Sequence, residues 1–287
     1  MIMYFLLIKK LIRNIINYEF FKNIENYIEK AISAESTTAY PKADTGCNHF
    51  VVTSRSYITD KERAKIICKQ FINLYDSLDD CKSRSNIDSY RKCSKFLNYW
   101  INFKLRESVL NDDDSFCYAY NGIESQFTST VEYHISLNKI YHIDKDELDK
   151  MNKLYNLYDK YSEINSILDA KSEQDKQKLL TLSTQCCTDY NEARYICNPE
   201  NNINNNNSKF CQELNKFESK YEEEIYKKVN EKGDDYTDHF IKLKECPNNK
   251  IITTAVTGSI VGLIPLLGIL YKVSELNIKL QILYGYQ

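Results

Sequence analysis

The segment from Ile251 to Tyr271 contains 21 consecutive residues without a charged side chain. As an α-helix it would be about 31 Å long, which matches the roughly 30 Å hydrocarbon core of a lipid bilayer. Lys250 and Lys272 stand at its two ends, where their ammonium groups can reach the lipid headgroups. A buried core helix is the alternative, although such helices seldom run this long without one charge. We therefore predict a single transmembrane helix over residues 251–271, with the lipid bilayer as a partner.

The predicted span divides the chain into unequal parts. Residues 59–246 are expected to form a cysteine-rich helical ectodomain, preceded by an N-terminal helical and loop extension over residues 1–58. The asparagine-rich, low-complexity stretch at residues 198–208 has no apolar anchors, and it predicts an exposed loop. A short tail, residues 272–287, follows the span.

Two glycines of the predicted span are candidates for helix packing. Gly258 and Gly262 have the G-x-x-x-G spacing that lets two membrane helices approach closely. Glycine is also common in spanning helices for other reasons, so both interpretations stay open.

The residues that flank the predicted span do not fix its orientation. Lysines both precede and follow it, so the positive charge is balanced across it. At the N-terminus the apolar run Met1–Ile8 comes before Lys9 and Lys10, which is the reverse of a secretory signal. An amphipathic first helix is the favoured interpretation of this segment. A protein displayed outside the cell and a tail-anchored protein facing the cytosol therefore both fit.

Residues that break regular backbone structure are scarce, with 7 glycines and 4 prolines in 287 residues. An all-β sandwich or barrel needs a turn signal about every 8–12 residues, which these cannot supply. Helices need far fewer, so an all-α fold is predicted. Apolar residues recur at three- and four-residue steps, as on one face of a helix, in the segments 64–81, 90–105, 148–168 and 214–229.

Helix boundaries are marked less evenly than helix faces. The run TDKE that begins at Thr59 has the spacing of a capping box, which predicts an N-cap at Thr59 with Glu62 reaching back to it. Residues 111–143 are ambiguous, because a turn-like acidic run at 111–114 is followed by sequence that fits a short helix.

All ten cysteines lie N-terminal to the predicted span. An even number confined to one side of a membrane favours disulfide bonds in an oxidising compartment, and several cysteines lie on apolar helix faces, where bonds would staple helix to helix. Reduced core cysteines are the main alternative, and the sequence fixes no pairing. Adjacent Cys186 and Cys187 are expected to serve different partners, because a bond between neighbours would strain the backbone. The structural disulfide candidates are Cys47, Cys68, Cys81, Cys93, Cys117, Cys186, Cys187, Cys197, Cys211 and Cys246.

The sequence carries no motif of catalytic or cofactor-binding chemistry. It lacks a phosphate-binding glycine loop, a G-x-S-x-G nucleophile elbow and an H-E-x-x-H helix. There is no C-x-x-C, and the four histidines lack the spacing of zinc ligands. Acidic runs at 112–114 and 222–224 are interpreted as a turn and a solvated helix face. With a net charge of −2 as well, we expect a binding or display protein without catalytic residues, cofactor, metal or nucleic-acid partner.

Four blocks of the sequence, distributed over about two-thirds of the chain, resemble a known family. CSKFLNYWINFKL at Cys93–Leu105 is similar to the family's cysteine followed by a Tyr-Trp pair, and LYNLYDKYSEI at Leu154–Ile164 reinforces it. A third block runs from CCTDYNEARYIC at Cys186 to Tyr221, and the last is the predicted span leading into LYK at Leu270–Lys272. In this order, the blocks resemble the variant interspersed-repeat (Vir/Pir) variant surface antigens of malaria parasites (Plasmodium).

The resemblance implies an α-helical ectodomain exported to the host red-cell surface or its membranes, with a short internal tail. It also implies antigenic variation, immune evasion and adhesion, with a host receptor or an antibody as the partner. Such proteins commonly lack a conventional signal peptide, so the resemblance places the cysteines outside. The tail 272–287 departs from the family because it lacks the Pro-Phe-Gly pattern that follows the span, and the first 50 residues or so are longer than the usual start. A tail-anchored or internal-membrane structural protein of the infected cell is the alternative.

Overall fold

The described part of the chain is mainly helical. The computed structural model describes residues 18–36, 41–82, 85–110, 113–130, 140–170, 176–198 and 208–246. These stretches contain helices, turns and one isolated β-bridge between Ile58 and Val109, with no strand among them. The predicted all-α fold is therefore confirmed for this part of the chain.

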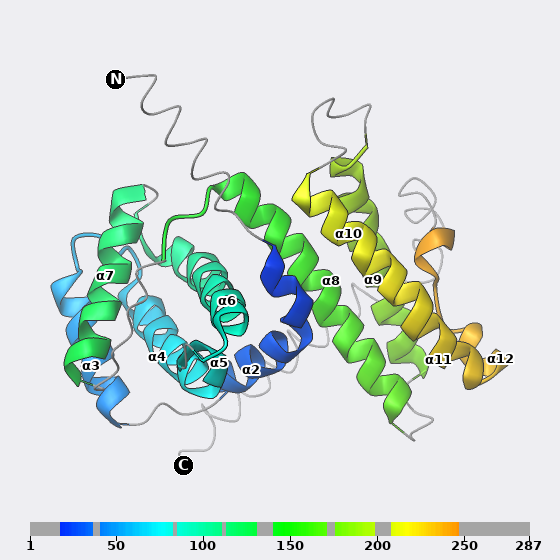
Figure 1. Cartoon of the computed structure of the whole chain (residues 1–287), viewed down its shortest axis with the longest axis horizontal. Coiled ribbons are helices and arrows are strands. Elements are labelled where there is room, and N and C mark those ends of the chain that lie inside the picture. The colour runs from blue at the N-terminus through cyan, green and yellow to red at the C-terminus, as the bar shows by residue number, and fades with distance from the viewer. Residues whose placement is uncertain are drawn as a thin grey trace, which may run out of the picture.

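The first group of helices lies on one side of the molecule (Figure 1). Within it α2 contacts α4, α3 contacts both α4 and α7, and α4 contacts α6. The group contains η1 (Glu19–Asn23), α2 (Ile24–Ser36), α3 (Pro41–Thr53), α4 (Lys61–Ser77), α5 (Asp79–Lys82), α6 (Ile87–Leu105), η2 (Arg106–Ser108) and α7 (Asp113–Thr130).

The helix α8 (Lys145–Asp169) lies between this group and a second one (Figure 1). It contacts α2 and α6 on one side and α9 and α10 on the other, so it joins both groups into one bundle. The second group contains α9 (Lys176–Ile196), α10 (Lys209–Lys220), η4 (Tyr221–Ile225), α11 (Tyr226–Glu231), α12 (Asp234–Thr237) and η5 (Leu243–Glu245).

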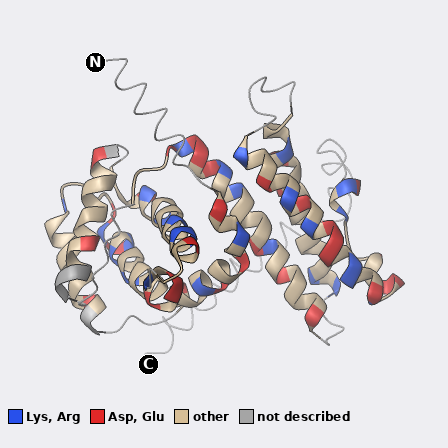
Figure 2. Cartoon of the chain, viewed as in Figure 1, with Lys and Arg blue, Asp and Glu red and all other residues tan. Residues whose placement is uncertain are grey.

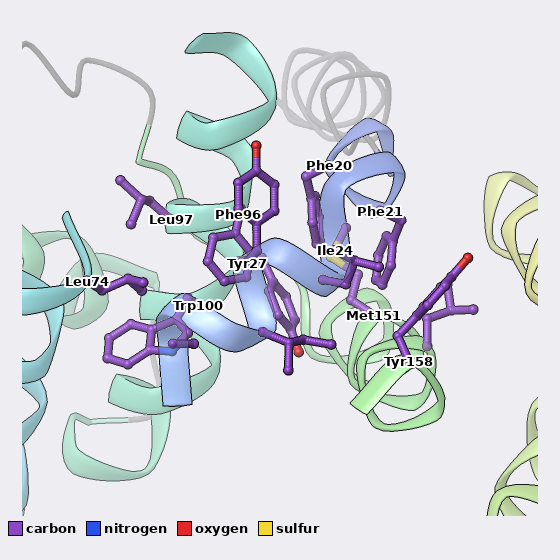
Figure 3. Close-up of a cluster of buried hydrophobic side chains, with 14 of the residues drawn as sticks. Phe20, Phe21, Ile24, Tyr27, Leu74, Phe96, Leu97, Trp100, Met151 and Tyr158 are labelled. Carbon is purple, nitrogen blue, oxygen red and sulfur yellow. The ribbon is translucent and has the colours of Figure 1, made fainter. Parts of the chain in front are cut away.

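Aromatic side chains fill the junction between η1, α2, α6 and α8 (Figure 3). Tyr27 stacks on Phe96 with ring centroids 4.6 Å apart, and Phe20 stacks on Tyr99 at 5.4 Å. Trp100 is buried beside them, and all five side chains are at most 1% exposed. Because burying a large apolar side chain contributes about 1.5–3 kcal/mol, this cluster is a main source of stability.

The apolar faces predicted from the sequence are the faces that the bundle buries. Every position that the spacing marks in segments 64–81, 148–168 and 214–229 is buried, and in segment 90–105 all are buried except the half-buried Tyr90. The first face is shared by two helices, because α4 ends at Ser77 and α5 begins at Asp79. The spacing of apolar residues therefore identifies the buried face correctly even where the helix is interrupted.

In the predicted N-terminal extension, residues 1–58, the described residues 18–36 and 41–58 belong to the same bundle. Phe20, Tyr27 and Phe50 are each at most 1% exposed. A disulfide between Cys47 and Cys68 crosses the boundary predicted at residues 58 and 59. The described part of the extension is thus a structural member of the helical domain.

The predicted capping box at Thr59 is wrong by one residue. The N-cap of α4 is Asp60, whose carboxylate accepts a hydrogen bond from the N–H of Arg63 at 3.0 Å. The N–H of Thr59 donates instead to the carbonyl of Ser108 at 2.9 Å, beside the bridge at Ile58. This pairing keeps Thr59 in the connection that precedes α4, so the helix starts after it.

The helix α7 is longer than predicted, and the helix α9 was not predicted from the sequence. The ambiguous region 111–143 contains α7, a full helix of 18 residues and not a short one. The sequence analysis did not identify α9, although Leu179, Leu182 and Tyr190 are buried along it. Small and polar residues such as Ser183 share its buried face, and they weaken the apolar pattern.

The predicted fourth helix is interrupted by a single π-helical turn. α10, η4 and α11 run without a break from Lys209 to Glu231, and the N–H of Tyr226 donates to the carbonyl of Tyr221, five residues earlier. The wider turn admits one extra residue without ending the helix. The face from 214 to 229 therefore stays buried across it.

None of the described helices is long and apolar enough to cross a membrane. The predicted span 251–271, its glycines Gly258 and Gly262, and the tail 272–287 lie outside the described residues. Most of the predicted asparagine-rich loop also lies outside them, although Ser208 at its end is described and caps α10 by accepting a hydrogen bond from the N–H of Cys211 at 3.2 Å.

Candidate functional site: the disulfide framework and the exposed surface

Four disulfides staple the described chain, and two of them lie in the first group of helices. Cys47 in α3 is bonded to Cys68 in α4, and Cys81 in α5 is bonded to Cys93 in α6. Their Cα–Cα distances of 5.7 and 5.4 Å are ordinary for disulfides. Both bonds join neighbouring helices, and the position of Cys68, Cys81 and Cys93 on apolar faces predicted such bonds between helices.

The other two disulfides lie in the second group of helices. Cys197, just after α9, is bonded to Cys211 in α10, so this bond joins the residues that flank the asparagine-rich stretch. Cys187 in α9 is bonded to Cys246, 59 residues later and at the end of the described chain. Eight of the ten candidates therefore form disulfides.

Cys117 and Cys186 lie outside these four bonds. Cys186 is completely buried in the core, and burial raises the pKa of its thiol, so the thiol stays protonated. Its neighbour Cys187 points elsewhere, because consecutive side chains on a helix are about 100° apart, and it reaches Cys246. Cys117 is exposed on α7. The sequence could not separate these two from the other eight, because pairing depends on which helices become neighbours.

A row of polar side chains on α6 holds an extended segment of the chain. Asn98 and Asn102 lie four residues apart on one face of the helix. The N–H of Tyr141 donates to Asn98 Oδ1, and the N–H of Ile143 donates to Asn102 Oδ1, each at 2.9 Å. Asn102 Nδ2 donates in return to the carbonyl of Tyr141 at 3.0 Å. We call Asn98, Asn102 and Arg106 the α6 polar row.

The α6 polar row fits an extended segment because of two repeat distances. Four residues of α-helix rise about 6 Å, and two residues of extended chain rise about 6.6 Å. The N–H groups of Tyr141 and Ile143, two residues apart, can therefore bind side chains on successive turns of α6. At the third position Arg106 donates to His142 Nε2 at 2.9 Å and to the carbonyl of Ile143.

The α6 polar row was missed by the sequence analysis. Asn98 and Asn102 are at most 1% exposed, although asparagine is usually found at the surface. The available signal was the i, i+4, i+8 spacing of Asn98 and Asn102 in α6 and Arg106 directly after it. Buried polar groups need partners, so this spacing could have predicted a bound backbone segment, although not which one.

A shallow hollow of about 410 Å³ runs along α10 and η4. Beside it, the hydroxyl of Tyr161 donates to a carboxylate oxygen of Glu224 at 2.6 Å, and burial raises the pKa of this phenol so that it stays neutral. The ammonium of Lys220 lies 5.2 Å from the Tyr161 ring and 2.8 Å from Glu25. These groups tie α2, α8 and η4 together. The hollow is lined by Asn215, Lys216, Ser219, Lys220, Glu223 and Glu224.

Charged residues of both signs are mixed along the helices (Figure 2). Many form ion pairs between neighbouring helices, such as Lys153 with Glu192 at 2.8 Å and Lys160 with Asp189 at 2.7 Å, both between α8 and α9. Such surface pairs contribute about 0–1 kcal/mol each. Within the described stretches, no group of three His, Cys, Asp or Glu side chains could hold a metal ion.

Exposed apolar side chains gather where α3 and α7 approach the β-bridge. Tyr118 is 54% exposed and stacks on Tyr57 with ring centroids 4.8 Å apart. Leu110 is 44% exposed, and its N–H donates to the carbonyl of Tyr57 at 2.9 Å. We call Tyr57, Leu110 and Tyr118 the α3–α7 aromatic cluster. It lies in the first group of helices, far from α12 in the second (Figure 1).

Comparisons of this chain with protein-family models, curated proteins and solved structures give no match. The Vir/Pir resemblance of its sequence blocks therefore stays a prediction.

Proposed function

We propose that this chain is a variant surface antigen of a malaria parasite, displayed on infected red-cell membranes by one transmembrane helix at residues 251–271. Its role is immune evasion and adhesion to a host receptor. The proposal combines the uncharged segment, the stapled helical domain before it and the resemblance of four sequence blocks to the Vir/Pir family.

The disulfide framework is the observation that carries the proposal. Eight of the ten cysteines are paired, and each pair joins segments that are neighbours in the bundle. Disulfides form and persist in oxidising compartments and are rare in the cytosol, where thiols are kept reduced. This framework supports a location of the helical domain on the oxidising side of the membrane.

The described surface also supports recognition of large partners. Its hollow along α10 and η4 is shallow, and the α3–α7 aromatic cluster is solvent-exposed. Small-molecule sites are usually concave and enclose their ligand, whereas protein partners bind across broader surfaces rich in aromatic side chains. An antibody or a receptor is the kind of partner that such a surface fits.

The alternative is a tail-anchored or internal-membrane structural protein of the infected cell. It fits the residues that flank the uncharged segment, because lysines both precede and follow residues 251–271 and do not fix the orientation of a span there. In that arrangement the helical domain would face the cytosol.

Protease shaving of intact infected cells tests the proposal. An antibody to residues 147–230 would detect the domain on reducing gels, because Cys197–Cys211 would otherwise hold cleaved fragments together. Surface display predicts loss of the signal in intact cells while a cytosolic marker survives. Protection until the membranes are permeabilised would contradict display and leave the internal-membrane alternative.

Thiol counting separates the two alternatives a second time. Cells are quenched with an alkylating reagent, and the denatured protein is analysed by mass spectrometry without reductant. Display predicts that the eight cysteines of the four disulfides are protected from alkylation. Alkylation of all ten would indicate a reduced domain facing the cytosol.

A further inference from the structure

The last described stretch of the chain is held firmly against the bundle. Cys246, the last described residue, is bonded to Cys187 in α9. Just before it, Phe240 stacks on Tyr221 with ring centroids 5.5 Å apart, and the N–H of Ile241 donates to Ser183 Oγ at 3.2 Å. Cys246 is therefore held at a fixed place beside α9 and η4.

Only four residues, 247–250, separate this point from the uncharged segment that begins at Ile251. Even fully extended, the five steps from Cys246 to Ile251 reach at most about 18 Å. If residues 251–271 span a bilayer, the surface around Cys246 must lie within that distance of the hydrocarbon boundary. A polar headgroup layer occupies about 5–8 Å of it, since the whole bilayer exceeds its core by about 10–15 Å.

The surface around this point has the chemistry of a membrane interface. The ammonium of Lys242 lies 4.2 Å from the centre of the Tyr226 ring and 3.1 Å from Glu245. Lys244 and Glu245 are exposed. Tyrosine and lysine side chains are typical of the headgroup level, where an apolar body and a polar tip are both accommodated. We call Tyr226, Lys242, Lys244 and Glu245 the exit face.

The exit face carries charges of both signs. Its two ammonium groups can pair with lipid phosphates, and the carboxylate of Glu245 can pair with a quaternary amine. Glu222 lies beside it and accepts a hydrogen bond from the N–H of Lys244 at 3.4 Å. This balance fits zwitterionic phosphatidylcholine headgroups better than a strongly anionic surface.

We propose that the exit face rests on zwitterionic lipid headgroups of the membrane that carries the protein, so that α9–α12 are membrane-proximal and the α3–α7 aromatic cluster is distal. This inference rests on the proposed function, because it requires residues 251–271 to span the bilayer. Beyond the proposed function, it specifies which face of the domain lies against the membrane and which face is accessible to partners.

Headgroup crosslinking tests this arrangement. The full-length protein is reconstituted into phosphatidylcholine vesicles that contain a lipid with a photoreactive headgroup, and crosslinked residues are mapped by mass spectrometry. The expected result is crosslinking at Tyr226 and at residues 242–245 at least tenfold above that at Tyr57 and Tyr118. Equal labelling of the exit face and the α3–α7 aromatic cluster would overturn the inference.

The same experiment separates this failure from failure of the proposed function. Equal labelling, together with resistance of the protein to alkaline carbonate extraction, would be consistent with the transmembrane helix and would contradict only the proposed orientation of the domain. Release by carbonate, with no crosslinks in residues 251–271, would contradict both the transmembrane helix and the orientation.

A linker variant provides a matched test that leaves the folded domain unchanged. Twelve glycine and serine residues inserted after Lys250 extend the tether by roughly 20 Å, from the end-to-end scaling of flexible chains. Crosslinking at Tyr226 should fall at least threefold, while labelling within 251–271 and carbonate resistance stay the same. Unchanged labelling of Tyr226 would contradict the short tether as the cause of the contact.

Discussion

Gly122 marks the closest approach of α3 and α7. A Cβ atom at this position would lie 2.3 Å from Ser54 Oγ and 3.1 Å from the Phe50 ring. We expect Gly122→Ala to lower the free energy of unfolding by about 1–3 kcal/mol, because a packed helix interface cannot absorb the extra methyl group. Urea unfolding followed by circular dichroism measures the change.

The control for this substitution is Asn121→Ala, at the exposed neighbouring position, which should change stability by less than about 0.5 kcal/mol. Ser54→Ala in the Gly122→Ala background removes the closest atom and should restore part of the loss. If Gly122→Ala is as stable as the unaltered protein, the two helices are further apart than described.

Asn102 is the residue of the α6 polar row with the most partners. It accepts from the N–H of Ile143 and donates to the carbonyls of Asn98 and Tyr141. Asn102→Ala removes the side-chain acceptor of the buried N–H of Ile143 and one donor to each of the Asn98 and Tyr141 carbonyls, so we expect a loss of about 2–3 kcal/mol in the free energy of unfolding. Hydrogen exchange should also accelerate at Tyr141 and Ile143.

Asn73→Ala is the comparison for this prediction. Asn73 Nδ2 donates to the carbonyl of Ala34 at 3.4 Å, near the surface, and its removal should cost less than about 1 kcal/mol. Equal losses for the two variants would mean that the segment 140–143 does not depend on the α6 polar row.

At the scale of helices, two substitutions at the start of α4 can distinguish the predicted N-cap, Thr59, from the observed one, Asp60. Asp60→Ala removes the observed cap and should destabilise the protein by about 1 kcal/mol. Thr59→Ala should have a much smaller effect, because the backbone and not the side chain of Thr59 makes the contact with Ser108. Thermal unfolding of the two variants measures this difference, and the opposite order would favour the capping box at Thr59.

The contact between α3 and α4 is sensitive to acid. A hydrogen bond from the ammonium of Lys69 holds the pKa of the Asp44 carboxyl below its usual range. A carboxyl whose pKa is lower in the folded state than in the unfolded state stabilises the fold above its unfolded pKa of about 3.9. This contribution is lost as the pH falls through the lower, folded pKa.

Two measurements check this acid dependence. An NMR titration should give Asp44 a pKa below that of a free aspartate, and Lys69→Ala should return it toward the usual value. Asp44→Asn should make the stability of the protein vary less with pH below about 4. An unshifted titration would contradict the ion pair.

Helix faces were easier to predict than helix identity. The positions 148–168 alternate apolar and polar residues at the helical period, and they became the central helix α8. In α9 the small side chains of Ser183 and Ala193 share the buried face, so the apolar period is faint. These small residues are buried because of what lies opposite them, which a single segment of sequence does not record.

At the scale of the whole molecule, the disulfide that closes the longest loop is Cys187–Cys246. Replacing both cysteines by serine should lower the free energy of unfolding by about 4 kcal/mol, because a crosslink over 59 residues restricts the unfolded chain strongly.

Hydrogen exchange locates the effect of this disulfide. Without it, the segment 234–246 should exchange faster, since Phe240 and Leu243 would be its main remaining anchors. The α6–α8 junction should stay protected. Uniform acceleration over the bundle would show instead that Cys187–Cys246 supports the whole fold.

The sequence by itself determined the helical class and the buried faces, because the apolar period of a helix and the scarcity of glycine and proline are local properties. It also predicted that most cysteines are bonded, from their number and their place on those faces. Only the tertiary structure decided which cysteines pair, that Cys186 and Cys117 lie outside the disulfides, and that Asn98 and Asn102 hold the segment 140–143. These outcomes depend on which segments, distant in the chain, become neighbours when the helices pack. The local pattern of apolar and polar residues in one segment does not determine which other segment will lie beside it.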